Sequence, residues 1–205
     1  YPKFIEKNST IGFVAPAFGC SIEPYRSAFD NGVKKLQEIG HAVQLGPNCY
    51  EGSGIGISNK PELCAKEFED MWCDAGNAAL FSCGGGELQC EILPFLDFEK
   101  IKASEAKWFM GYSDNTNLSL LLATICDTAS VYGPNAPAFG MEPWHSSVQD
   151  AYELVRGTKL MFESYDGWQS ESLKTEEEPL LPYNITEQPS MRTVNMKQPF
   201  TGRLL

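Results

Sequence analysis

Basic residues, histidine and long apolar runs are all scarce in this sequence of 205 residues. Lysine and arginine total 16 against 27 aspartates and glutamates, so the formal net charge is −11. Such a charge opposes binding to nucleic acid or to an anionic membrane, because both are polyanions. No apolar run approaches the roughly 20 residues that a transmembrane helix needs, and residues 1–10 are too polar for a secretion signal. We therefore expect no nucleic acid and no membrane as partner, and a cytoplasmic location.

Paired cysteines are also missing, since the seven cysteines include no Cys-x-x-Cys motif. Such motifs are typical of zinc sites and of redox centres. The number of cysteines is odd and most of them stand within apolar stretches, which favours buried free thiols over disulfides. We expect neither a metal nor a cofactor.

Apolar runs of strand length are abundant in the first 160 residues, and helical patterns separate them. Phe29, Val33 and Leu36 recur at helical spacing before Gly40, and Phe68 and Trp72 follow Pro61 in the same way. Strands that alternate with helices predict a parallel sheet covered by helices on both faces. The predicted fold class is α/β, Rossmann-like or flavodoxin-like, with strands at residues 11–14, 42–45, 78–83, 107–111 and 130–135, of which 107–111 is taken as the central one. Residues 52–56, although rich in glycine, predict a surface loop.

The pattern changes at about residue 157. Several prolines and the acidic run at residues 176–178 replace the alternation, which is typical of a linker or an extended crossover. Residues 200–205 look like the start of a strand. We therefore expect an α/β domain at residues 1–160, a linker or crossover at 161–199, and at 200–205 the first strand of a further domain. The sequence is then the N-terminal portion of a longer protein, truncated before a second domain.

Ser113 stands where the run at 107–111 gives way to a segment of helical length. One interpretation is that Ser113 or Asp114 caps the helix, because both residue types are preferred at that position. The other is that Ser113 is a nucleophile on a sharp strand-to-helix turn, with the Asp114 N–H as an oxyanion donor. The elbow of ordinary α/β-hydrolases has a glycine two residues after the serine, where this chain has Asn115, so that family is not indicated.

Three glycines, residues 84–86, follow the run at 78–83 and precede Glu87. Glycines let backbone N–H groups approach a ligand closely, although a tight turn needs glycine equally. The carboxyl ends of parallel strands meet at one edge of a sheet, where α/β folds bind ligands. The glycine loop and the Ser113 turn are therefore placed to share one pocket.

These segments, in this order, resemble the N-terminal portion of the LD-carboxypeptidases, a family of serine peptidases that includes the microcin-C immunity proteins. The matching pieces are IGFVAP at residues 11–16, the pair Gly85-Gly86 with LPFLDF at 93–98, GYSD at 111–114 and YGP at 132–134. The resemblance covers most of residues 11–140 and returns at 202–205. It implies that Ser113 is the nucleophile and that the backbone N–H groups of Asp114, Gly85 and Gly86 form the oxyanion hole.

Three further residues, Glu87, Tyr112 and Asn135, are assigned to substrate binding. The Glu and the His of the family's triad belong to a C-terminal domain, so the resemblance implies that both lie beyond residue 205. His41 is expected at the surface, and His145, in a loop, is weighed as an alternative base. Because a serine hydroxyl needs an adjacent base, we expect this chain alone to be inactive.

The leading hypothesis is a serine carboxypeptidase that cleaves a C-terminal amide bond through an acyl-enzyme on Ser113. Its substrate is then a murein tetrapeptide, or a peptidyl-nucleotide of the microcin-C type. The aromatic residues between 144 and 199 favour the second class, since aromatic rings stack on nucleobases. The competing hypotheses are a non-catalytic α/β domain that binds a carboxylate or phosphate at helix N-termini, and a pseudoenzyme. Homodimers are common among such proteins, so a homodimer is expected.

Overall fold

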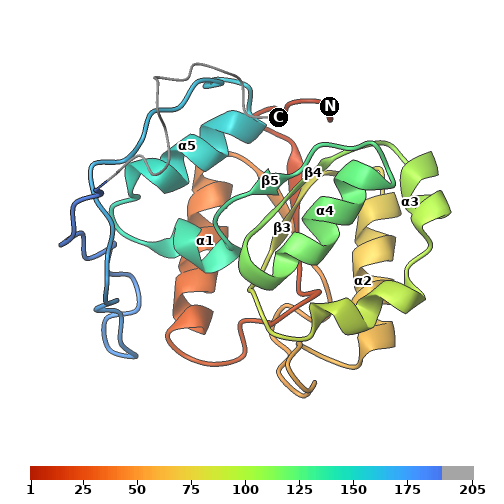
Figure 1. Cartoon of the computed structure of the whole chain (residues 1–205), viewed down its shortest axis with the longest axis horizontal. Coiled ribbons are helices and arrows are strands. Elements are labelled where there is room, and N and C mark those ends of the chain that lie inside the picture. Colours follow the sequence, from red (N-terminus) through yellow and green to blue (C-terminus); the bar gives the residue numbers. More distant parts are fainter. Residues whose placement is uncertain (191–205) are drawn as a thin grey trace, which may run out of the picture.

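The computed structural model describes residues 1–190 as a layered α/β fold (Figure 1). Five parallel strands form one sheet in the order β2-β1-β3-β4-β5. This order confirms the α/β class and is the flavodoxin-like one. It also corrects one prediction, because β3 and not β4 is the central strand. The strands are β1 (Thr10–Val14), β2 (Ala42–Leu45), β3 (Asn77–Ser82), β4 (Trp108–Gly111) and β5 (Val131–Tyr132).

Helices cover both faces of the sheet, as the alternation predicted. Figure 1 shows α1 (Tyr25–Ile39) and α5 (Ser146–Val155) on one side, and α2 (Pro61–Cys73), α3 (Phe98–Ala103) and α4 (Thr116–Thr124) on the other. Within residues 1–190, three short 3-10 helices complete the layers: η1 (Gln89–Phe95), η2 (Ser113–Asn115) and η3 (Ala136–Gly140). The sequence pattern had not indicated η1, α3 or η3.

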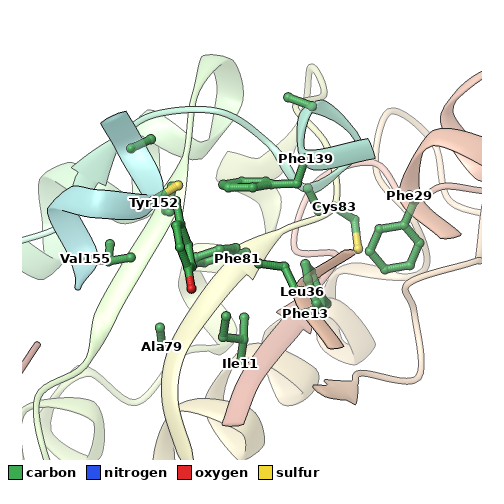
Figure 2. Packing of buried hydrophobic residues seen from close by; sticks show 14 of the residues in the cluster. Ile11, Phe13, Phe29, Leu36, Ala79, Phe81, Cys83, Phe139, Tyr152 and Val155 are labelled. Atoms are coloured by element: carbon green, nitrogen blue, oxygen red, sulfur yellow. The ribbon is translucent and has the colours of Figure 1, made fainter. Parts of the chain in front are cut away.

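The strands separate two hydrophobic cores because neighbouring side chains of a strand point to opposite faces. Phe81 packs on the α1 side, whereas Leu80 packs on the α2 side. Figure 2 shows the first core, in which Phe81 stacks on Phe139 with ring centroids 5.2 Å apart and Phe13 meets Phe29 edge to face. Burial on both faces explains why the three inner strands, β1, β3 and β4, read as continuous apolar runs.

His41 is buried in the first core, so its predicted surface position was wrong. Its side chain is only 4% exposed, and its ring nitrogens lie 3.0 Å from the Ser9 carbonyl oxygen and 2.8 Å from the Tyr152 hydroxyl. Burial lowers the pKa of His41 below its usual value. Gly40, the predicted end of α1, does adopt the left-handed conformation with φ of 118°.

The segment after α5 contains no helix up to residue 190, and one antiparallel bridge joins Trp168 to Glu187. It lies beside α5 and η3, since the Tyr165 hydroxyl donates to Asp150 and the Glu142 N–H donates to the Leu180 carbonyl. The predicted domain boundaries at 160 and 199 stay predictions. The predicted strand at 200–205 and the resemblance at 202–205 lie outside the described residues.

All seven cysteines are free and five are buried, which confirms the prediction of buried thiols. Within residues 1–190, no cluster of three or more His, Cys, Asp or Glu side chains is arranged to hold a metal ion. No helix in this part of the chain combines the length and the apolar character that crossing a membrane requires.

Candidate active site

The candidate site lies at the carboxyl edge of the sheet. The strand order reverses direction between β1 and β3, and in such sheets the loops beyond this point diverge and leave a crevice for ligands. The glycine loop, residues 84–86, follows β3, and the Ser113 turn follows the adjacent β4. The two segments that sequence reasoning selected are therefore neighbours at this edge.

Ser113 has a strained backbone and an exposed side chain. Its φ is 63°, one of two positive values among the non-glycine residues that the structure describes. Within residues 1–190 its hydroxyl forms no hydrogen bond. The N-cap of α4 is Asn115, without a side-chain cap, so neither Ser113 nor Asp114 caps this helix and the capping interpretation was wrong. The turn instead leaves an exposed hydroxyl at the carboxyl edge of the sheet.

Gly85 lies directly against Ser113. A Cβ added to Gly85 would lie 2.9 Å from the Ser113 Cβ and 3.1 Å from its Oγ, so only glycine permits this approach. A Cβ on Gly86 would lie 3.2 Å from Oδ2 of Asp114. Among the described residues, the N–H groups of Gly85 and Gly86 have no hydrogen-bond acceptor. The structure thus brings both glycines close to Ser113 and Asp114, and within residues 1–190 their N–H groups are free to bind a ligand.

Asn115 joins the two loops from beneath. It is fully buried, and its Nδ2 donates to the Gly84 carbonyl at 2.8 Å and to the Tyr112 carbonyl at 3.1 Å. Its Oδ1 accepts from Nε2 of Gln89, which is also fully buried, at 2.9 Å. The sequence pattern had marked Asn115 only as a departure from the hydrolase elbow. Asn115 stands close to the start of an apolar run, and this position could have indicated that its polar side chain is buried.

Asp114 and Asn135 strengthen the same connection. Oδ2 of Asp114 accepts from the Gln89 N–H at 2.7 Å, which ties the Ser113 turn to the segment after the glycines. Asn135 is 7% exposed, and its Oδ1 accepts from the Tyr112 N–H at 3.2 Å. Asn135 therefore supports the turn from within, and its contact with substrate stays a prediction. Glu87 is exposed beside Gly86, with its N–H donating to the Gly56 carbonyl.

A groove of about 280 Å³ opens next to Ser113. We call it the tyrosine groove, and it is lined by Tyr112, Tyr132, Gly133, Pro134, Ser147 and Tyr183. The Tyr132 hydroxyl accepts the Ser113 N–H at 3.2 Å, so one residue that lines the groove contacts the Ser113 backbone. Burial raises the pKa of Tyr112, and it raises that of Tyr183 to about 12. The groove thus offers phenol rings and no charged side chain.

Within residues 1–190, neither histidine is hydrogen-bonded to Ser113. Nδ1 of His145 accepts from the Ser147 N–H at 3.2 Å and caps α5, and its ring packs against Tyr183 and Tyr165. His41 is in the core. Within residues 1–190 no side chain is bonded to the Ser113 hydroxyl, so the described residues supply no general base there.

Glu67 on α2 holds the loops after β1 and β2 and was missed in the sequence. It is 3% exposed, and its carboxylate accepts the N–H groups of Ala15 and Asn48 at 2.9 and 2.8 Å. Burial raises the pKa of Glu67 to about 7, against the opposing effect of those two donors. The loop it holds also reaches the site, because the Phe18 N–H donates to the Gly85 carbonyl at 2.8 Å.

Comparison with known proteins gives one family match. The family described as the LD-carboxypeptidase N-terminal domain matches residues 11–133. The chain is 28% identical over 163 residues to a probable murein peptide carboxypeptidase of Bacillus subtilis, covering 78% of this chain and 49% of that protein. It is 29% identical over 135 residues to the microcin C7 self-immunity protein MccF of Escherichia coli, covering 65% and 38%.

Solved structures share the fold. MccF in complex with glutamyl sulfamoyl guanosine superimposes with a TM-score of 0.78 at 23% identity, covering 91% of this chain and 57% of that one. MccF in complex with aspartyl sulfamoyl adenosine gives the same TM-score of 0.78 at 24% identity. The chain spans about half the length of the curated relatives it matches.

Proposed function

Since this chain belongs to the LD-carboxypeptidase family, we propose that it carries the nucleophile of a serine carboxypeptidase, and that the nucleophile is Ser113. The main support is the geometry of the turn: a serine at φ of 63°, with an exposed and unbonded hydroxyl, packed against Gly85. A strained turn that exposes a serine at the end of a strand is the arrangement that nucleophilic serine enzymes use.

The reaction we propose is hydrolysis of a C-terminal amide bond. Oγ of Ser113 attacks the scissile carbonyl carbon and gives up its proton to a base, and the resulting oxyanion accepts N–H groups of Asp114, Gly85 and Gly86. The C–N bond then breaks, the amine leaves with a proton from the base, and an ester remains on Ser113. Water hydrolyses this ester and releases the shortened product. The N–H groups of Gly85 and Gly86 have no acceptor among residues 1–190, which supports their role as donors.

We propose that the base comes from outside residues 1–190, which is supported by the contacts of His41 and His145 with other residues. We propose that the full-length protein supplies a His, oriented by a Glu, from a C-terminal domain that closes over the carboxyl edge of the sheet. A nucleophile without its base and the group that orients the base loses most of its reactivity. The chain of 205 residues is accordingly proposed to be inactive by itself.

Two substrate classes fit this reaction: a murein tetrapeptide, and a peptidyl-nucleotide of the microcin-C type. The tyrosine groove favours the second class, since exposed phenol rings beside Ser113 suit a planar base better than a charged peptide. Hydrolysis of a tetrapeptide with a C-terminal D-residue, measured against hydrolysis of aspartyl sulfamoyl adenosine, separates them. If the tyrosine groove binds a planar base, kcat/KM should be higher for aspartyl sulfamoyl adenosine than for the tetrapeptide.

A serine-directed fluorophosphonate tests the nucleophile. The full-length protein should be labelled stoichiometrically, with the adduct on Ser113 by mass spectrometry, and Ser113→Ala should abolish labelling. Ser170→Ala, at an exposed serine far along the chain, is the matched control and should be labelled like the wild type. Absence of labelling together with tight binding of phosphate or acetate would favour the non-catalytic domain, since donors such as Gly85 and Gly86 also suit a bound anion.

A further inference from the structure

Tyr132 combines high exposure with a specific contact to the proposed nucleophile. Its side chain on β5 is 66% exposed, yet its hydroxyl oxygen accepts the N–H of Ser113, a residue on another strand-to-helix turn, at 3.2 Å. An exposed tyrosine gains nothing in core packing from this position. The hydrogen bond therefore holds the Ser113 turn in place, and contributes little to the stability of the whole fold.

The direction of this hydrogen bond determines what the Tyr132 hydroxyl can still do. A phenol has one O–H donor and can also accept, and here the acceptor side is occupied by the Ser113 N–H. The O–H hydrogen must then point away from that N–H, and within residues 1–190 it has no acceptor. Tyr132 also lines the tyrosine groove beside Tyr112 and Tyr183. Its free donor is thus available to whatever occupies the groove.

The groove restricts the chemistry of that occupant. Its six lining residues carry aromatic rings, a proline ring and hydroxyl groups, and none of them is charged. A charged group held there would lose hydration without gaining an ion pair. An uncharged segment with an oxygen acceptor, such as a carbonyl, carboxamide or ring hydroxyl, would satisfy the unpaired donor.

We propose, on the basis of the function proposed above, that Tyr132 contacts the substrate and positions the nucleophile with the same hydroxyl. Its oxygen fixes the Ser113 backbone, and its O–H donates to an oxygen on the uncharged part of the substrate that lies in the tyrosine groove. Tyr132 is thereby a specificity residue for substrates that carry such an acceptor next to the scissile bond.

Tyr132→Phe in the full-length protein tests this, because it keeps the ring and removes both hydrogen bonds. One neutral hydrogen bond corresponds to a factor of about 2 to 12, so the loss of two should lower kcat/KM for substrate about 4-fold to 140-fold. A small fluorophosphonate does not fill the groove, so its rate of reaction reports only how Ser113 is positioned. The rate of Ser113 labelling should therefore fall only by the factor for one hydrogen bond, about 2-fold to 12-fold. The control is Tyr50→Phe, which removes a hydroxyl that donates to Asp30 at 2.6 Å on α1.

The outcomes separate this inference from the proposed function. A variant that labels and hydrolyses like the wild type, with a wild-type melting temperature, would overturn the role of Tyr132 and leave the Ser113 proposal standing. Equal losses in labelling and hydrolysis would overturn the substrate contact. Failure of the wild type to label at Ser113 would remove the proposed function, and this inference with it.

Discussion

Gly85→Ala is the substitution on which the site geometry makes the sharpest prediction. The new methyl carbon would lie 2.9 Å from the Ser113 Cβ and 3.1 Å from its Oγ, whereas carbon atoms in contact need about 3.5 to 4.0 Å. Either the serine or the glycine loop must therefore move by roughly 0.5 to 1 Å. Displacement of a reacting group by about 1 Å can cost about 100-fold in rate, and loss of one oxyanion donor costs a similar factor.

The fold should tolerate this change. Gly85 is not among the glycines with positive φ, so alanine fits its backbone, and the residue is only half-buried. We expect kcat of the full-length protein to fall about 100-fold, with a nearly unchanged melting temperature. Gly76→Ala is the matched control, because its new Cβ would meet only the Asp74 carboxylate, at 3.1 Å, in an exposed loop.

Steady-state hydrolysis, the rate of fluorophosphonate labelling and thermal unfolding are measured on both variants and on the wild type. Wild-type kcat and labelling in a folded Gly85→Ala protein would refute the reasoning, since they would mean that the chemistry does not occur where Gly85 meets Ser113. A loss that the control shares would point to a general effect of glycine replacement instead.

Two further predictions concern the residues beneath the site. Asn115→Ala leaves the carbonyls of Gly84 and Tyr112 without their donor, so the free energy of unfolding, measured in urea, should fall by about 2 to 4 kcal/mol. A loss below about 0.5 kcal/mol, the value of one weak hydrogen bond, would contradict the network. Burial raises the pKa of Glu67 from 4.5 to about 7, so over this range the native state keeps a proton that the unfolded chain has released. Stability should therefore fall as pH rises from 4.5 to 7, by about 3 kcal/mol from this group, and Glu67→Gln should remove that slope. His41, with its lowered pKa, makes stability rise with pH below pH 6.5 in the wild type and in Glu67→Gln alike. The test is therefore the difference in unfolding free energy between these two proteins. If that difference stayed constant from pH 4.5 to 7, the raised pKa would not belong to Glu67.

The strands and the main helices were predictable because their signals are local. Burial on both faces gives continuous apolar runs such as residues 78–83, and Gly40 marks the end of α1 by itself. The order of the strands is not local, since it depends on which runs pair across the sheet. The central place of β3 instead of β4 therefore became visible only in the structure.

Buried polar residues were the least predictable feature. His41 pairs with Tyr152, 111 residues further along the chain, and nothing near His41 in the sequence indicates that partner. Glu67 occupies a helix, where a glutamate ordinarily faces water, but it receives two backbone N–H groups from the loops after β1 and β2. Such partners are set by tertiary packing, which a pattern of neighbouring residues does not record.

The candidate site was predictable in its parts but not in its connections. A serine between a strand and a helix, and glycines after the preceding strand, indicated both loops, and their meeting at one sheet edge followed from parallel topology. The choice between helix cap and exposed hydroxyl needed the backbone angle of Ser113. The links through Asn115 and Gln89 needed coordinates, because they join residues from separate loops.

The left-handed backbone conformation of Ser113 lowers the stability of the fold, although the proposed chemistry needs a serine at this position. A residue with a side chain costs about 1 to 2 kcal/mol in that conformation, and glycine would relieve most of the cost. Selection for heat resistance alone would thus favour replacing the serine, and only selection for activity would retain it. Descendants of this chain that lost their substrate would be expected to drift toward glycine at this turn while keeping the rest of the fold.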